Sequence, residues 1–147
     1  MNNQTFSIKH RIELDVKPAS VYDAVSTQAG LASWWTTMVE TSGELGSLAA
    51  FRFGDGEHGA DMRIDTLTEG MLVRWHCVDG PWKGLDFTFD IQPHERGSVL
   101  RFENSGWPET GDFYMHCNAK WGFFLAVSLK QLLETGAGVP HPDDPRI

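Results

Sequence analysis

The stretch DFYMHCNAKWGFFLAVSLKQLLETGAGVP, residues 112–140, decides the fold because the hydrophobic period changes there from that of strands to that of a helix. Gly136 stands where a glycine commonly ends a helix, and Pro140 cannot continue one. The stretch therefore predicts one long helix with an inner face that must pack on another element. The positions of this face follow the i, i+3, i+4, i+7 spacing, namely Trp121, Phe124, Leu125, Ser128, Leu129 and Leu132.

Six segments before this helix alternate apolar and polar residues, which is typical of strands with one buried face. In the first segment, Ile8 and Ile12 share one face, while Lys9 and Arg11 share the other. Short turns rich in Gly, Asp and Pro separate the last five segments, so we expect an antiparallel meander. The six are FSIKHRIELDV (6–16), SLAAFRFG (47–54), GADMRIDTL (59–67), MLVRWHCV (71–78), LDFTFDIQP (85–93) and SVLRFENSG (98–106).

Two short helices are predicted between the first strand and the second. Pro18 lies where a first helical turn tolerates proline, and Thr27 is placed to cap a second helix that ends near Ser33. Together the elements predict an α+β fold, with a curved antiparallel sheet of about six strands wrapped around the long C-terminal helix. Because a curved sheet and a straight helix diverge, we expect a ring-lined wedge of space between them.

Length and composition describe an ordinary globular chain. Its 147 residues suffice for one domain over 1–147, with a loose polar tail at 137–147. A net charge of −8 argues against sequence-independent binding to nucleic acid or anionic membranes, which needs clustered Lys and Arg. No apolar run is long enough to span a membrane, and no signal peptide is visible at the N-terminus. With Cys77 and Cys117 outside any CxxC pair, we expect a cytoplasmic protein with free thiols.

An ordered set of motifs resembles the SRPBCC superfamily, the helix-grip domains of the birch-pollen-allergen and START type. Within it, the chain looks most like the group named after the activator of the Hsp90 ATPase. The resemblance covers roughly residues 6–140. It is carried by VKPASVYDAVST, GLASWW, MLVRWHC followed by PWKGLDFTFDIQP, SVLRFENSGW, and KWGFFLAVSLKQLLETGAGVP.

This resemblance implies a helix-grip fold that holds small apolar or amphipathic molecules in a cavity under the long helix. Some members of the superfamily are cyclases or hydrolases, and others only carry ligands. The co-chaperone activity that gives the group its name is implied to belong to longer proteins with an additional N-terminal domain, so Hsp90 activation is not expected of this chain. The family supplies no catalytic motif that matches these residues.

The adjacent pair Trp34 and Trp35 cannot both point into one core from one helical face, because neighbouring side chains on a helix lie about 100° apart. We expect Trp34 to pack and Trp35 to face the cavity. The polar residues His116, Asn118 and Ser128 on the helix are expected as anchors among apolar walls, with Arg74 or His76 added if that strand turns. The predicted ligand-lining residues are Trp35, Phe51, Phe53, Met62, Ile64, Trp75, Phe87, Phe89, Phe102, His116, Trp121, Phe124 and Ser128.

Neither catalysis nor metal binding has a clear motif. The strand carboxylates alternate to the wet face, and no HExxH, CxxC, P-loop or nucleophile-elbow spacing is present. His76 and Cys77 are adjacent in a strand, so they face opposite ways and cannot both bind one ion. We therefore predict no metal and no cofactor, and we favour a carrier over an enzyme.

Three functions remain open at this point. The first is binding or carriage of a small apolar ligand, and the second is a cyclase or hydrolase that uses a histidine as its base. The third is an interaction module, including a homodimer, in which Trp35, Trp82 or Trp107 forms an exposed patch. A buried histidine–carboxylate pair in the cavity would favour the enzyme, and exposed rings would favour the interaction module.

Overall fold

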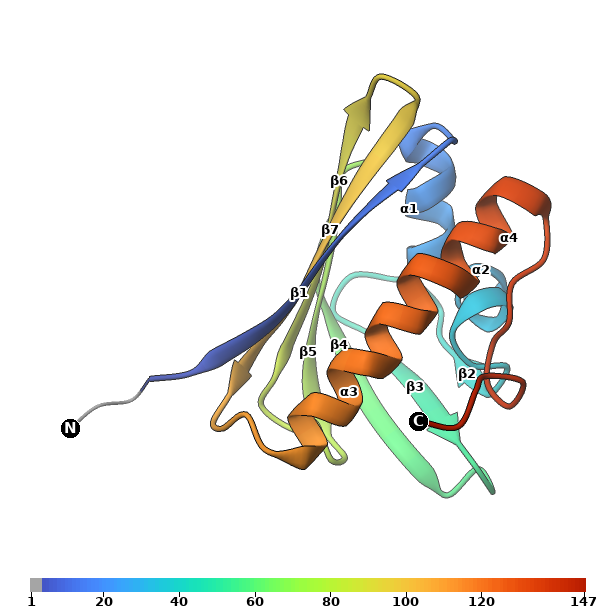
Figure 1. The fold of residues 1–147 in the computed structure, drawn as a ribbon. Helices are drawn as coiled ribbons and strands as arrows, with labels where there is room; N and C mark the ends of the chain where they lie inside the picture. The colour runs from blue at the N-terminus through green and yellow to red at the C-terminus, as the bar shows by residue number, and fades with distance from the viewer. Residues whose placement is uncertain (1–3) are drawn as a thin grey trace.

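The computed structural model describes residues 4–147. They form a curved sheet with the long C-terminal helix lying across one of its faces (Figure 1). All neighbouring strands pair antiparallel, in the spatial order β1-β7-β6-β5-β4-β3-β2. The strands are β1 (Phe6–Leu14), β2 (Val39–Glu40), β3 (Leu48–Phe53), β4 (His58–Thr68), β5 (Leu72–Asp79), β6 (Asp86–His94) and β7 (Gly97–Trp107).

The sheet has seven strands, whereas the sequence predicts about six. The additional strand is β2, which consists of two residues and pairs with Ala50 and Phe51 of β3. Two residues are too few to show alternation, so the hydrophobic pattern gives no signal for this strand. The α+β class and the antiparallel meander of β3 to β7 are as predicted, whereas the pairing of β1 with β7 was not specified by the sequence pattern.

Two short helices follow β1, and both begin where the sequence places them. Pro18 opens α1 (Pro18–Ser26), and the side chain of Thr27 caps α2 (Gln28–Trp34) by accepting a hydrogen bond from Gly30 N at 3.0 Å. The indole Nε1 of Trp34 donates to the carbonyl of Ala24 at 2.8 Å. This buried hydrogen bond ties α2 to α1 and fixes the direction in which the chain leaves the helix pair.

The long helix runs without interruption through α3 (Asp112–Phe123), a π-helical stretch η1 (Phe124–Leu129) and α4 (Lys130–Thr135). Gly136 ends it with a left-handed φ of 97°, a conformation that glycine adopts without strain. Phe124, Leu125, Ser128 and Leu129 of η1 are all buried against the sheet and the helix pair. None of the helices in residues 4–147 is long and apolar enough to cross a membrane.

The segment after Gly136, which its polar composition predicts to be loose, is bound back onto the helix pair and β3. Its Gly138 passes so close to α2 that a Cβ atom there would lie 2.5 Å from the carbonyl oxygen of Ser33. Further on, His141 N donates to the carbonyl of Trp35 at 2.8 Å, and Thr37 N donates to the carbonyl of His141 at 3.1 Å. We call residues 137–147 the C-terminal strap.

Candidate functional site

Over most of its length, the space between the sheet and the long helix is filled with aromatic rings. The ring centroid of Trp121 lies 4.5 Å from that of Phe102 and 5.0 Å from that of Trp35. Trp75 and Phe89 lie 5.0 Å apart. Each of these five side chains belongs to a residue that is at most 2% exposed. The wedge expected along the helix is therefore closed in the middle, because rings from both sides meet across it.

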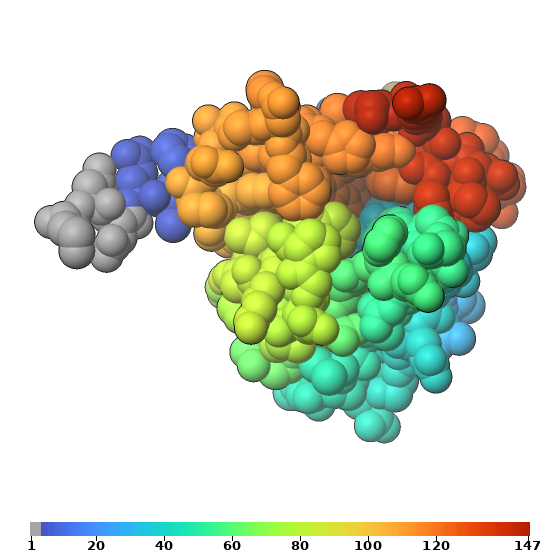
Figure 2. Space-filling view, turned by 90° about the horizontal axis from the view of Figure 1, so that it is seen from below, coloured from blue at the N-terminus to red at the C-terminus, as the bar shows by residue number. Residues whose placement is uncertain are grey.

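A recess of about 230 Å³ remains at the end where α3 begins, and it opens to solvent. Figure 2 looks onto this end of the molecule, where α3, the loop between β5 and β6, the tip of the β3–β4 hairpin and the C-terminal strap surround a hollow in the surface. The recess is lined by Trp35, Phe53, Trp82, Phe113, His116, Cys117, Lys120, Trp121, Phe124, His141 and Asp144.

Trp35 joins the filled interior to the recess. Its ring stacks on Trp75 inside the core, with a centroid distance of 5.9 Å and an interplanar angle of 9°. It also stacks on Trp82, at 6.1 Å and 22°, and meets the edge of Phe53 at 5.7 Å. Trp34 next to it is completely buried and makes no wall of the recess. The two adjacent indoles thus occupy different environments, one in the core and one at its border.

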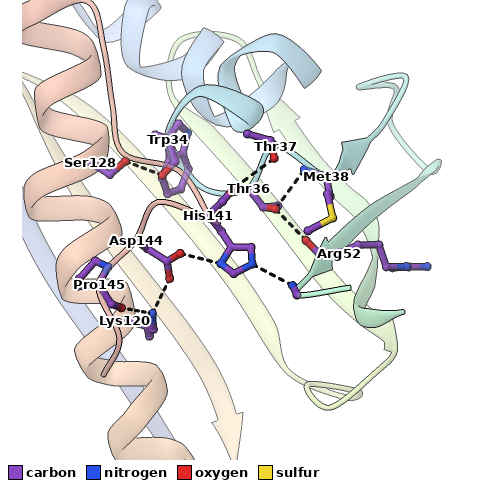
Figure 3. A network of polar contacts seen from close by, with 11 residues as sticks. Trp34, Thr36, Thr37, Met38, Arg52, Lys120, Ser128, His141, Asp144 and Pro145 are labelled. Atoms are coloured by element: carbon purple, nitrogen blue, oxygen red, sulfur yellow. Dashed lines mark hydrogen bonds and ion pairs between the residues drawn. The ribbon is translucent and has the colours of Figure 1, made fainter. Parts of the chain in front are cut away.

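The polar side of the recess is a hydrogen-bonded set of three residues, shown in Figure 3. Asp144 accepts hydrogen bonds from Lys120 Nζ at 2.5 Å and from His141 Nδ1 at 2.7 Å. The backbone N–H of Gly54 donates to His141 Nε2 at 2.9 Å, so this nitrogen carries no proton. The hydrogen bonds therefore assign a neutral imidazole with its proton on Nδ1. We call Lys120, His141 and Asp144 the polar rim.

Ionisation of Asp144 depends on this arrangement. Its side chain is only 7% exposed, and such burial by itself raises the pKa of a carboxyl group. The hydrogen bonds from Lys120 and His141, together with the nearby positive charge of Lys120, outweigh burial and hold the pKa of Asp144 below its ordinary value. The rim consequently presents a paired carboxylate and ammonium to the recess at neutral pH.

Cys117 of α3 and Trp82 of the loop between β5 and β6 meet on another part of the recess wall. Burial raises the pKa of the Cys117 thiol, and the neighbouring indole N–H of Trp82 offsets only part of this effect. The contact is not a hydrogen bond of regular geometry, since the buried Nε1 of Trp82 has no acceptor among residues 4–147. This wall is therefore apolar apart from one donor whose contact with the Cys117 sulfur is weak.

Cys117, His141 and Asp144 are the residue types of a Cys–His–Asp nucleophilic site, but their geometry does not support that chemistry. The thiolate is the nucleophile in such sites, and burial keeps Cys117 protonated by raising its pKa. The free nitrogen of His141, which would have to take the thiol proton, already accepts the N–H of Gly54. These contacts give the polar rim the role of anchoring the C-terminal strap.

Five of the thirteen residues predicted to line a ligand site border the recess: Trp35, Phe53, His116, Trp121 and Phe124. Ser128 lies away from it, completely buried, where its Oγ donates to the carbonyl of Trp34 at 2.7 Å and accepts from Val139 N at 2.8 Å. The other seven are rings and aliphatic side chains of the sheet that do not line the recess, namely Phe51, Met62, Ile64, Trp75, Phe87, Phe89 and Phe102.

Six lining residues are missing from the sequence-based set: Trp82, Phe113, Cys117, Lys120, His141 and Asp144. Helical spacing contains a signal for three of them, because Phe113, Cys117 and Lys120 precede Trp121 and Phe124 at intervals of three and four residues. Trp82 has a weaker signal as a large ring in the loop sequence DGPWKG. His141 and Asp144 have none, because only the return of the strap brings them to the helix.

The remaining titratable clusters lie outside the recess. On the outer face of the sheet, His76 Nδ1 lies 2.8 Å from Asp86 Oδ1, and Arg74 lies 3.5 Å from the other oxygen of Asp86. His10, on the inner face, pairs with Asn118 of α3 at 3.0 Å. Among residues 4–147, no three His, Cys, Asp or Glu side chains are grouped so as to hold a metal ion.

Comparison with known proteins places the chain in a family. The family described as Activator of Hsp90 ATPase homolog 1-like protein matches residues 15–134. The chain belongs to this family, within the SRPBCC superfamily. The match confirms the resemblance seen in the sequence motifs. No curated protein matches the chain.

Solved structures agree with this membership. The solution structure of the Aha1 dimer from Colwellia psychrerythraea is 38% identical, with a TM-score of 0.82 over 90% of this chain and 99% of that chain. A protein from Staphylococcus saprophyticus is 18% identical, with a TM-score of 0.76 over 91% of this chain and 96% of that one. A Bacillus halodurans protein is also 18% identical, with a TM-score of 0.74 over 88% and 97%. The last two show the shared fold alone.

Proposed function

We propose that this protein binds a small apolar or amphipathic molecule in the recess between α3 and the sheet. The observation that supports this proposal is an aromatic-lined opening at one end of an interface whose middle is filled with rings. Ligand sites are typically concave and mostly apolar, with a few polar groups that orient the ligand. Here six rings form the walls, and His116 and the polar rim form the edge. A cytoplasmic location is part of the proposal, since Cys77 and Cys117 are free thiols.

The size and charge of the recess limit the ligand. A volume of about 230 Å³ is below the roughly 300–1,000 Å³ of sites for drug-sized molecules. The ligand would therefore be one or two rings or a short chain. Because Lys120 and Asp144 neutralise each other, the rim attracts neither anions nor cations strongly. An uncharged body with a polar end that reaches His116 fits this environment.

Binding is favoured over catalysis because the recess offers no activated group. Lys120 and His141 are both engaged with Asp144, and the Cys117 thiol is kept protonated by burial. A cyclase or hydrolase would have to use His116, which is exposed at the rim. If replacement of His116 by Ala abolished the turnover of an apolar substrate, that result would support an enzyme over a carrier.

A matched pair of variants on α3 tests the binding proposal. Phe113 lines the recess and is 45% exposed, whereas Met115 is 55% exposed and does not line it. Loss of one aromatic contact is worth about 0.5–1.5 kcal/mol, so Phe113→Ala should weaken ligand affinity roughly 2- to 12-fold. Met115→Ala should leave affinity unchanged. The measurement is tryptophan fluorescence titration with a panel of small phenols, bicyclic aromatics and medium-chain alcohols and acids.

Two results of this titration would count against the proposal. The first is the absence of any saturable signal across the panel with the wild-type protein. The second is equal weakening by Phe113→Ala and Met115→Ala, which would place the ligand on the outside of the helix. Thermal unfolding of both variants provides the control that each remains folded.

We also propose that two copies of the chain associate through the outer side of the long helix. The relative from C. psychrerythraea, 38% identical, is a dimer. On this chain Met115, Ala119, Phe123 and Val127 recur at intervals of four residues, and Met115 and Val127 are 55% and 43% exposed. Apolar side chains gathered on one exposed face commonly mark an interface.

Light scattering coupled to size-exclusion chromatography tests this association. Val127→Asp would place a charge in the middle of a dry contact, so the variant should elute as a monomer at concentrations where the wild type is a dimer. Leu45→Asp is the control, because Leu45 is 63% exposed in the loop before β3, away from this helix face. A wild-type protein that stays monomeric at high concentration, or a dimer insensitive to Val127→Asp, would rule out this interface.

A further inference from the structure

The recess has a side chain that fills part of the space a ligand would use. The geometry points to Trp82 as a movable plug that yields its place to the flat ring of an uncharged aromatic ligand. This inference rests on the proposed function, and it adds the chemical class of the ligand and the way the site opens.

The indole of Trp82 occupies a seat formed by three other rings. It stacks on Trp35 at 6.1 Å and 22°, and it meets Phe53 at 6.1 Å and 81° and Phe87 at 5.8 Å and 63°. One stacked surface with two edge-to-face neighbours is the arrangement that a flat aromatic group prefers. Phe87 does not line the present recess, so removal of the indole would extend the recess inward as far as Phe87.

The three surrounding rings provide good aromatic contacts for the ring of Trp82, but they provide no hydrogen-bond acceptor for its N–H group. Nε1 of Trp82 is buried, and apart from a weak contact with the Cys117 thiol it has no hydrogen-bond acceptor of regular geometry among residues 4–147. Trp34 and Trp107, in contrast, donate to the Ala24 carbonyl at 2.8 Å and to Asn104 Oδ1 at 2.9 Å. A buried donor without an acceptor of regular geometry opposes the closed position, since outward rotation of the side chain would give the N–H to water.

The backbone around Trp82 does not need to change for the side chain to rotate. The loop closes on itself through Lys83 N to the Gly80 carbonyl at 3.2 Å and Leu85 N to the Trp82 carbonyl at 2.9 Å. Gly84 N donates to the carbonyl of Cys77 in β5 at 2.9 Å. None of these backbone hydrogen bonds reaches α3 or the C-terminal strap. Rotation of the Trp82 side chain therefore breaks its ring contacts and its weak contact with the Cys117 thiol, but no backbone hydrogen bond.

The vacated seat determines the class of ligand. Its three walls are aromatic, and a charged group placed among them would lose its hydration without gaining a partner. The ligand that fits is an uncharged planar system of one or two fused rings, with any polar substituent directed toward His116 and the polar rim. A flexible aliphatic chain of the same polarity would not reproduce the stacking on Trp35.

Nuclear magnetic resonance of protein labelled with ¹⁵N at the tryptophan indoles tests the movement without any ligand. Trp82 should exchange its indole proton with water at least about tenfold faster than Trp34 and Trp107, because its closed state lacks a hydrogen bond of regular geometry. Trp82→Phe assigns the signal. If the indole proton of Trp82 exchanged as slowly as those of Trp34 and Trp107, the proposal that Trp82 is a movable plug would be contradicted.

Titration with 2-naphthol, and with 1-octanol as the non-planar comparison, tests the ligand class. Binding of 2-naphthol should speed the indole exchange of Trp82, and 1-octanol should not. In Trp82→Ala the seat is already empty, so the affinity for 2-naphthol should rise about tenfold if the open state of the wild type is populated to about 10%. Thermal unfolding checks that the variant is folded, and the wild-type exchange measurement does not depend on it.

The outcomes separate the two proposals. If 2-naphthol binds the wild type and Trp82→Ala equally well, or if 1-octanol displaces Trp82 as effectively, the plug is overturned while ligand binding in the recess stands. If neither the wild type nor Trp82→Ala binds 2-naphthol or any other member of the panel, both the plug and the proposed function fail.

Discussion

The two ends of the helix–sheet interface use the same kind of residue with opposite results. Around Phe89, the rings of Trp75 and Phe102 lie 5.0 and 5.1 Å away, and no space is left. Around Trp82, the rings of Trp35 and Phe53 are more distant, at 6.1 Å each, and a recess of about 230 Å³ opens beside them. An aromatic-rich inner face therefore does not by itself make a cavity.

The backbone explains the difference between these two regions. In the middle, β5, β6 and β7 pair in regular register, and rings of β6 and β7 meet Trp121 at the end of α3, so large rings interdigitate from both sides. At the other end, the walls come from a loop, a hairpin tip and the C-terminal strap. These segments share no register with the helix, and the polar rim, which holds the strap in place, supplies hydrogen bonds in place of packing.

The largest expected effect comes from the filled region. Phe89 is completely buried among aromatic rings, so Phe89→Ala should lower the free energy of unfolding by about 3–5 kcal/mol through lost contacts and a new cavity. Urea denaturation measures this change. Ligand affinity in the recess should stay within twofold of wild type. Phe113→Ala, in contrast, should weaken ligand affinity and leave the protein folded. Equal weakening of ligand binding by both variants would show that core and recess respond as one unit.

A smaller effect is expected from the polar rim. Asp144→Asn removes a buried charge that pairs with Lys120, and it should cost about 1–3 kcal/mol at neutral pH. Asp143→Asn is the matched control, because the neighbouring Asp143 is exposed and its side chain makes no described contact. Chemical denaturation of wild type and both variants measures the differences in unfolding free energy.

The same pair of variants gives a pH dependence with a definite sign. The pKa of Asp144 is lower in the folded protein than its ordinary value of 3.8, so the unfolded chain binds the proton more tightly. The contribution of Asp144 to stability is therefore complete above about pH 4 and is lost as the pH falls through the lowered pKa. The gap between wild type and Asp144→Asn should narrow over that acidic range, and a gap that widens there would contradict the rim geometry.

The smallest effect changes a reaction rate and not the stability of the fold. Cys77 is completely buried in the core, and burial raises its pKa to about 11, whereas Cys117 borders the recess. At pH 8 roughly one Cys77 in a thousand is ionised, so iodoacetamide should label Cys117 first, as followed by mass spectrometry. A ligand in the recess should slow labelling of Cys117 only. Faster labelling of Cys77 would contradict the distinction between a closed core and an open end.

The walls of the candidate site were predictable mainly where they follow a regular period, and the adjacency of Trp34 and Trp35 indicated one more wall residue, Trp35. Trp121 and Phe124 were found because helical spacing marks the inner face of the C-terminal helix, and Phe113 and Cys117 lie on the same face. The sheet residues around Phe89 carry the same inward signal, yet they fill the core. Alternation reports which face a side chain occupies, and it contains no information on whether an opposing side chain reaches it.

By itself, the sequence determined the α+β class, the six longer strands, the two short helices with Pro18 and Thr27 at their starts, and the long helix ended by Gly136. These features depend on local periodicity, capping and backbone preference, which neighbouring residues specify. Only the tertiary structure decided the two-residue strand β2, the return of His141 and Asp144 to Lys120, and the division of the interface into a filled middle and an open end. Those features depend on distances between segments remote in the chain, and such distances are set by how all the elements pack together.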